Sequence, residues 1–439
     1  MLLKKFIQPL CLIFGLAFWS HAQPFDPILA SQLQSTLNQF RTGNNLKGIS
    51  ASVFIPGSGT WTGVSGISHT GVPVSPAMQF GIGSNTKLFT GVLLLKLSES
   101  NLLQLDDPIH EYLPPLNHVD SNITIRQLLN HTSGLADVTG VPGYSDSILS
   151  NPNRIFSPNE VIRWIGPPSF APGTGFEYSN TNYLLAGMIA EIAGGQSFGT
   201  LLRNLILSPL QMDSTYLDVF DTVPPPIAHP WQNGNDNFSV PRKALNSSAW
   251  AAGAMYSTAT EMVHWYRSLM GGQVLNAASF SEMTTFSIPG NYGIGLYQTP
   301  VQGRTVWQHG GTIWGGYNSS MVYDTAGGFV ICVLINQNPA QAFTAARQLL
   351  SAILSSPVAI RDRRRSGTGI RLLPNPASGV LDLEVPGEEV LDISVFHTTG
   401  KRIPLNSTPP VSVAGLPPGL YFLQVRTDRG HHVGRWRKE

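Results

Sequence analysis

The sequence has little cysteine, little charge and no long apolar run beyond its N-terminus. Only two cysteines, Cys11 and Cys332, occur in 439 residues, and charged residues make up 12% of the chain. Cys11 lies in the N-terminal apolar stretch that we expect to be removed, so no disulfide can form within the remaining chain, and the fold must rely on its core. Cys332 lies in the apolar run 329–335, which predicts a buried and unreactive thiol.

Other function classes are also disfavoured. The net charge is +1 at pH 7, which gives no indication of nucleic-acid binding. No metal-ligand spacing such as H-E-x-x-H occurs, so neither a metal ion nor another cofactor is predicted. No later segment is apolar over the length of a membrane span. The 44 glycines and 33 prolines are typical of a loop-rich exported protein.

Residues 1–22 are predicted to be a signal peptide. Lys4 and Lys5 form a basic start, residues 10–19 are apolar, and residues 20–22 read Ser-His-Ala, a small-x-small cleavage site. The apolar stretch is too short to span a bilayer, which disfavours an N-terminal anchor. Cys11 lies inside this stretch and not at its end, which disfavours a lipoprotein.

Residues 23–355 are predicted to form an α/β body with strands at both ends and helices between them. Strands are expected at 50–54, 61–67, 305–309, 319–324 and 328–336, and amphipathic helices at 27–40 and 339–354. Capping boxes at Thr124, Ser157 and Thr258 predict helix starts in the middle. The fold class is therefore an antiparallel sheet flanked by helices plus a mostly helical subdomain, with a cleft between them.

The composition changes after this body. Residues 356–370 contain an arginine cluster followed by glycines and are predicted to be a solvated linker. In residues 371–439 apolar residues alternate with polar ones, which predicts a small all-β sandwich. The alternating positions are Leu381, Leu383, Val385, Leu391, Ile393, Val395, Tyr421, Leu423 and Val425.

Ser84 and Lys87 have the spacing of neighbours on one helix face. The apolar run 88–95 follows them, and only four lysines occur between residues 23 and 355. Burial lowers the pKa of a lysine, and a neutral amine can take the proton of a serine hydroxyl. On this motif alone, a nucleophilic serine and a structural coincidence are equally favoured.

Two further motifs carry candidate chemistry. Tyr178 and Asn180 lie on a Gly- and Pro-rich loop just before a helical run, where a tyrosine can act as acid or base if cations lower its pKa. A packed loop tyrosine is the alternative.

The segment from His309 to Thr312 reads His-Gly-Gly-Thr at a predicted strand end. There a backbone amide can donate to an oxyanion, and His309 can supply a proton or a positive field. A plain strand-end turn is the alternative.

Together and in this order, the three motifs resemble those of the serine β-lactamase and penicillin-binding family. Its pattern is S-x-x-K, Y-x-N and K/H-x-G, and the match is best with its class C branch of β-lactamases, D-Ala-D-Ala carboxypeptidases, D-aminopeptidases and esterases. The segments 80–83, 125–135, 253–258 and 292–295 also match. The resemblance covers nearly the whole body.

The resemblance implies acyl transfer through a covalent serine ester. Ser84 would attack a carbonyl, and Lys87 and Tyr178 would move the proton. The backbone amides of Ser84 and Thr312 would form the oxyanion hole. Water would then release the acyl group, with no cofactor.

The remaining motif residues are implied to bind substrate. Asn180 would orient the lysine or the substrate, and His309, Gly310 and Gly311 would line the substrate site, whereas His131 is interpreted as structural. Typical class C β-lactamases carry lysine where this chain has His309. Since a permanent cation is missing there, esterase or peptidase activity is favoured over β-lactam hydrolysis.

The tail resembles the C-terminal sorting domain of the type IX secretion system of Bacteroidetes, through residues 373–377, 400–401 and 415–421. This implies the type IX secretion machinery as a partner and a secreted or cell-surface location.

The overall hypothesis is a secreted serine hydrolase acting on an ester or a peptide-like amide. A β-lactamase or D-Ala-D-Ala carboxypeptidase and an inert peptidoglycan-binding protein are the alternatives. Loops 139–158 and 224–246 are expected to shape the pocket.

Overall fold

The computed structural model describes residues 25–356, except 288 and 314, and residues 370–438, except 374, 376, 386–387, 398–401, 404–409 and 428–430. The predicted signal peptide and all but the first and last residues of the predicted linker lie outside the described residues. Within the described part, no helix has the length and apolar character needed to cross a membrane.

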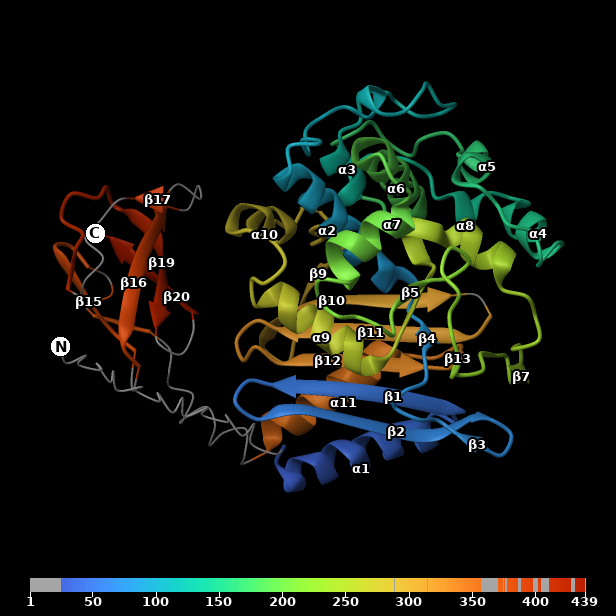
Figure 1. Ribbon diagram of the computed structural model, residues 1–439, viewed down its shortest axis with the longest axis horizontal. Helices are drawn as coiled ribbons and strands as arrows, with labels where there is room; N and C mark the ends of the chain where they lie inside the picture. Colours follow the sequence, from blue (N-terminus) through green and yellow to red (C-terminus); the bar gives the residue numbers. More distant parts are fainter. Residues whose placement is uncertain are drawn as a thin grey trace, which may run out of the picture.

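The body is built on a seven-stranded antiparallel sheet (Figure 1). Its strand order is β3-β2-β1-β12-β11-β10-β9. The strands are β1 (Gly48–Ile55), β2 (Gly59–His69), β3 (Val72–Pro73), β9 (Tyr297–Val301), β10 (Arg304–Ile313), β11 (Tyr317–Asp324) and β12 (Val330–Ile335). β1 pairs with β12 from Ile49↔Ile335 to Phe54↔Val330. The prediction of a sheet whose strands come from both ends of the body is therefore confirmed.

Each face of this sheet contributes to a different core, because successive side chains of a strand point to opposite faces. On β12, Ile331 and Val333 belong to the core shared with α1 and α11, whereas Cys332 and Leu334 belong to the larger core shared with α9. Cys332 is fully buried, as predicted. The helices of these layers are α1 (Pro27–Gly43), α11 (Ala342–Ser355) and α9 (Ala259–Met270).

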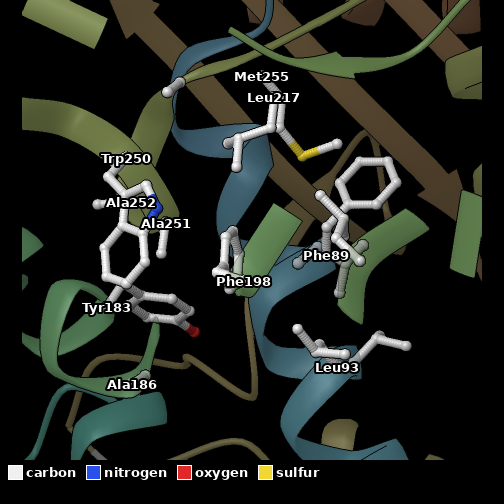
Figure 2. Packing of buried hydrophobic residues seen from close by; sticks show 14 of the residues in the cluster. Phe89, Leu93, Tyr183, Ala186, Phe198, Leu217, Trp250, Ala251, Ala252 and Met255 are labelled. Carbon is white, nitrogen blue, oxygen red and sulfur yellow. The ribbon is translucent and has the colours of Figure 1, made fainter. Parts of the chain in front are cut away.

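The helical part is organised around α2 (Thr86–Glu99), which is buried on nearly every side. Such an all-round apolar helix needs neighbours on all faces, and α6 and α8 pack against it (Figure 2). The other helices of this part are α3 (Ile125–Leu129), α4 (Tyr144–Leu149), α5 (Pro158–Val161), α6 (Asn180–Gly194), α7 (Phe198–Leu202), α8 (Lys243–Gly253) and α10 (Ala277–Met283).

Two small sheets join the helical part to the main sheet. Their strand orders are β4-β8-β5 and β13-β6-β7. The strands are β4 (Phe80–Gly81), β5 (Tyr216–Leu217), β6 (Trp231–Gln232), β7 (Asn235–Asp236), β8 (Met255–Ser257) and β13 (Gln337–Asn338). The first of these sheets holds the segment that enters α2, and this fixes where that helix begins.

Two of the three predicted capping boxes are confirmed. The boxes that begin at Thr124 and Ser157 show both reciprocal hydrogen bonds. Thr258 accepts from the backbone N–H of Glu261 as expected. The carboxylate of Glu261, however, accepts from the backbone N–H of Ser214 at 2.7 Å instead of returning to the cap. A tertiary partner has replaced the local one, so the third box is only half formed.

The expected strand end at His309 is wrong. β10 continues to Ile313 and pairs with β11 as far as Ile313↔Tyr317. Of the two glycines that suggested a turn, Gly311 instead allows close packing. A Cβ on Gly311 would lie 2.0 Å from the carbonyl oxygen of Ile82, so only glycine lets β10 approach the segment before α2.

The C-terminal unit is all-β, as predicted, and consists of sheets β14-β15-β18 and β17-β16-β19-β20. Its strands are β14 (Arg371–Leu373), β15 (Val380–Glu384), β16 (Val390–His397), β17 (Arg402–Ile403), β18 (Val411–Ser412), β19 (Gly419–Thr427) and β20 (His431–Lys438). Leu391 is 50% exposed instead of joining the predicted inward row. The pairing of β16 with β19 shifts register between Val390 and Asp392, which breaks the alternation there.

We expect Phe89→Ala to lower the free energy of unfolding by about 4 kcal/mol, because a fully buried aromatic ring leaves a cavity. Phe89 on α2 is 0% exposed and stacks on Trp265 at 4.3 Å between ring centroids. Denaturant unfolding of the two proteins measures the difference. Ile192→Ala, at a side chain that is 53% exposed, is the control. Equal unfolding midpoints for both variants would contradict the assignment of this core.

Candidate active site

Ser84 lies in a single turn that connects β4 to α2. This turn is a 3₁₀ segment, Gly83–Asn85, and Gly83 has φ +54°. A Cβ on Gly83 would lie 2.8 Å from the backbone nitrogen of Thr312 on β10. The tight turn therefore places the half-buried serine directly against the backbone of β10.

The amine of Lys87 has three oxygen atoms around it. Its Nζ lies 3.1 Å from Ser84 Oγ, 2.7 Å from Asn180 Oδ1 and 2.8 Å from the carbonyl oxygen of Ala252. The amide and carbonyl oxygens can only accept hydrogen bonds. A neutral amine therefore donates its two hydrogens to them, and its lone pair is left for the hydroxyl of Ser84.

Burial makes that neutral form accessible. Lys87 is 0% exposed, and desolvation lowers its pKa to about 7, although the carboxylate of Asp137 acts in the opposite direction. A large fraction of the amine is thus uncharged near neutral pH. The rings of Tyr178 and Tyr183 lie 4.9 and 5.6 Å from Nζ and contribute to the desolvation.

Asp137 fixes the orientation of Asn180. Its Oδ2 accepts from Asn180 Nδ2 at 2.9 Å, and its Oδ1 accepts from the backbone N–H of Thr139 at 2.9 Å. Because the amide nitrogen is held by the carboxylate, the amide oxygen faces Lys87. Asp137 was not identified from the sequence, where it is a lone carboxylate in the segment after His131.

The end of α8 supplies the backbone carbonyl. Trp250 has φ +34° and ψ −119°, outside the helical region, a conformation that costs on the order of 1–3 kcal/mol for a bulky residue. The next two carbonyls point away from their own helix, since Ala251 O accepts from Thr90 Oγ1 at 2.7 Å and Ala252 O accepts from Lys87. The last carbonyls of a helix lack intrahelical partners, and here α2 provides them.

Tyr178 lies beside this pair with its hydroxyl buried. The hydroxyl has no hydrogen-bond partner at normal distance among the described residues. Burial raises its pKa well above 10, although the nearby Ser84 side chain offsets part of the rise. Tyr178 is therefore a neutral phenol near pH 7, and the condition that cations lower its pKa is not met.

His309 is also neutral, which excludes the positive field, one of the two roles considered for it. It is 2% exposed, and desolvation, reinforced by the charge of Lys87, lowers its pKa to about 3. Its Nδ1 lies 2.6 Å from the carbonyl oxygen of Gly310, which can only accept, so its Nε2 accepts from the hydroxyl of Tyr292 at 3.0 Å. Both ring nitrogens are thus engaged within the protein.

His131 supports the tyrosine loop, in line with its structural interpretation. Its Nδ1 lies 3.2 Å from the backbone nitrogen of Ser179 and 3.0 Å from Asn182 Nδ2. Its ring packs 4.4 Å from the ring of Tyr178 between centroids, and burial lowers its pKa well below 6.5. A neutral histidine therefore fixes the backbone directly after Tyr178.

A cavity of about 130 Å³ opens beside the serine. Ser84, Asn180, Thr312 and the start of the loop 139–158 line it, together with residues of α8. The expected substrate residues His309, Gly310 and Gly311 are not part of this lining. Across the described ranges, no group of three His, Cys, Asp or Glu side chains is placed to hold a metal ion.

Comparison with known families agrees with this arrangement. The family model described as Beta-lactamase matches residues 33–354. The chain belongs to this beta-lactamase family. Residues 371–438 match the secretion system C-terminal sorting domain, which indicates sorting to the cell surface or beyond. The body therefore has the fold of this family, and the predicted resemblance of the tail to a C-terminal sorting domain is confirmed.

Solved structures of similar proteins match this chain over most of their own length. A D-stereospecific amidohydrolase from Streptomyces sp. is 29% identical, with a TM-score of 0.65 over 74% of this chain and 98% of that one. D-amino acid amidase from Ochrobactrum anthropi SV3, solved with L-phenylalanine, is 27% identical, with a TM-score of 0.67 over 77% of this chain and 99% of that one.

Curated relatives match shorter stretches. Protein flp of Staphylococcus aureus (strain COL) is 39% identical over 151 residues, which are 33% of this chain and 29% of that protein. The putative penicillin-binding protein PbpX of Bacillus subtilis (strain 168) is 26% identical over 272 residues, which are 61% of this chain and 64% of that protein. The match therefore spans less than a third of Protein flp.

We expect the reactivity of Ser84 to rise with pH around a midpoint near 7. Below that pH Lys87 holds a proton and cannot accept another, whereas Tyr178, His131 and His309 stay neutral through this range. The rate of labelling by a fluorophosphonate probe, followed by intact mass, measures the profile. Lys87→Met should abolish the profile and Lys96→Met, at the other lysine of α2, should leave it intact. A midpoint near 10 would contradict a desolvated amine.

We expect Asp137→Asn to shift the midpoint of the same profile to lower pH. The carboxylate of Asp137 raises the pKa of Lys87 against the effect of burial, so its removal favours the neutral amine. The plateau rate should also fall, because the orientation of Asn180 is no longer fixed by a charged acceptor. Asp146→Asn, at an exposed carboxylate on α4, is the matched control. An unchanged or raised midpoint would exclude the interaction.

Proposed function

We propose that this beta-lactamase-family body is a serine hydrolase that cleaves amides or esters through an acyl group on Ser84. The single observation that supports this most is the arrangement around Lys87 Nζ. Two fixed acceptors, Asn180 Oδ1 and the carbonyl of Ala252, leave the lone pair of the neutral amine for the hydroxyl of Ser84. A protein that only bound its ligand would gain nothing from a dehydrated amine at this place.

In the first step Ser84 Oγ attacks the carbonyl carbon, and its proton moves to Lys87 Nζ. The carbonyl oxygen becomes an oxyanion, and the backbone N–H groups of Ser84 and Thr312 are the proposed donors to it. Both residues line the same cavity. The turn at Gly83 brings the two backbone segments together.

In the second step the bond to the leaving nitrogen or oxygen breaks, and the leaving group takes a proton. Tyr178 is proposed to transfer this proton, since its hydroxyl is protonated, buried and close to Ser84. The proton held by Lys87 then restores the phenol. Water attacks the serine ester, gives its proton to the same pair of groups, and releases the acid and free Ser84.

The preferred substrate class is an uncharged, peptide-like amide or ester. His309 is neutral at physiological pH and bonded to Tyr292 and Gly310, so this position offers no cation for a substrate carboxylate. The amidohydrolase and the amidase among the solved relatives favour amides. β-Lactams and D-Ala-D-Ala peptides are the second candidates, because PbpX is described as a putative penicillin-binding protein.

The C-terminal unit is proposed to serve export and not catalysis. Its match to a sorting domain supports recognition by type IX secretion machinery. The signal peptide expected at residues 1–22 completes this proposal. The body would then act on substrates at the cell surface or outside the cell.

We expect the wild-type chain to turn over at least one of four probes, and Ser84→Ala to lower its kcat by about four orders of magnitude. The probes are amino acid amides of both configurations, p-nitrophenyl esters, a chromogenic cephalosporin and a D-Ala-D-Ala peptide. Ser98→Ala, at a serine of α2, should keep full activity. An acyl group on Ser84, seen by intact mass, identifies the intermediate. Equal turnover by wild type and Ser84→Ala would exclude this mechanism.

A further inference from the structure

A second and larger cavity adjoins the one beside Ser84. Its volume is about 420 Å³, against about 130 Å³ for the inner one. Leu245 on α8 lines both cavities. The loops 139–158 and 224–246, which were expected to shape the pocket, supply most of its lining. We call this second space the outer cavity.

The lining of the outer cavity is mainly apolar and partly open to solvent. Leu149, Phe238 and Val240 belong to it and are 56%, 45% and 52% exposed. Large apolar side chains gathered at the mouth of a cavity, next to a reactive group, indicate a site for an apolar part of a ligand.

The one charged group in this lining is compensated. Arg242 donates from Nε and Nη2 to the two carboxylate oxygens of Asp218, at 2.6 and 3.2 Å. The polar side chains of the lining are also engaged, since Asn237 Nδ2 donates to the carbonyl of Gly315 and Gln232 Oε1 accepts from Asn338. The outer cavity therefore favours an uncharged occupant.

Phe238 is held in place although it is half exposed. Its ring stacks on His229 at 3.8 Å between centroids with an interplanar angle of 1°, and His229 stacks on His69 at 3.8 Å. Asp236 accepts from the backbone N–H of Phe238 and from His229 Nδ1, at 3.0 and 2.9 Å. A wall that is ordered before the ligand arrives costs less to organise on binding.

We propose that the outer cavity receives a bulky, uncharged apolar or aromatic substituent of the substrate whose carbonyl group lies at Ser84. Leu245 lines both cavities, so they are neighbours, and the proposed substrate reaches from one to the other past this residue. This inference rests on the proposed function, because it names the substrate class of the same site. It assigns specificity to Phe238 and Val240, which take no part in the chemistry at Ser84.

Binding to the full-length Ser84→Ala variant tests this inference without turnover. The probes are N-acetyl-phenylalaninamide and N-acetyl-alaninamide, each in D and L form, measured by isothermal titration. We expect the better phenylalanine enantiomer to bind about tenfold or more tightly than its alanine counterpart. Adding Phe238→Ala should remove most of that difference, whereas Phe422→Ala, at an exposed phenylalanine of the C-terminal unit, should preserve it.

A further probe tests the charge preference, and the outcomes separate the two proposals. N-acetyl-phenylalanine, with its free carboxylate, should bind no better than the amide. Equal binding of phenylalanine and alanine probes, or a preference that persists in Phe238→Ala, would overturn the outer-cavity assignment. If only the proposed function were wrong, the Ser84→Ala variant would still bind the phenylalanine probes more tightly. The wild-type chain, however, would show no turnover that depends on Ser84.

Discussion

The candidate site depends on one interaction, the removal of water from the amine of Lys87. Desolvation lowers the pKa of this lysine to about 7. Two fixed acceptors take the hydrogens of the neutral amine, so that its lone pair points to the hydroxyl of Ser84. Neither effect is sufficient alone. A dehydrated amine without the acceptors could rotate freely, and the same acceptors around a solvated amine would hold an ammonium ion that takes no proton from a serine.

The fold supplies this environment from distant parts of the chain. The turn before α2 brings Ser84, α2 brings Lys87, α6 brings Asn180, α8 brings a carbonyl, and β10 brings Thr312. The pairing of β1 with β12 joins the N-terminal strands to the C-terminal strands, and β10 meets the segment before α2 at Gly311. The apolar packing around α2 (Figure 2) therefore has two consequences, since it stabilises the body and also sets the acidity of its one fully buried lysine.

The sequence predicted the architecture and the Ser84–Lys87 pair because both depend on local spacing. The apolar run 329–335 marked β12, and the spacing of three placed the two side chains on one helix face. The sequence could not show that β10 continues through Gly310 and Gly311, because the close approach of Ile82 that makes glycine necessary comes from a segment more than 220 residues earlier. The neutral states of His309 and Tyr178 were missed for the same reason, since burial is a property of the whole fold. Asp137 carries no motif, and only its contact with Asn180 reveals its role.

The bend at Trp250 has a consequence for how the site tolerates change. In an α-helix most backbone carbonyl oxygens accept hydrogen bonds within the helix, so they are not available to groups beside it. At this bend two such oxygens face α2, and one of them completes the surroundings of Lys87. A peptide oxygen has no side chain to be replaced, so no single substitution at residue 252 can delete that acceptor. That part of the site can persist through extensive sequence divergence, provided that the chain keeps its break in helical geometry two residues earlier.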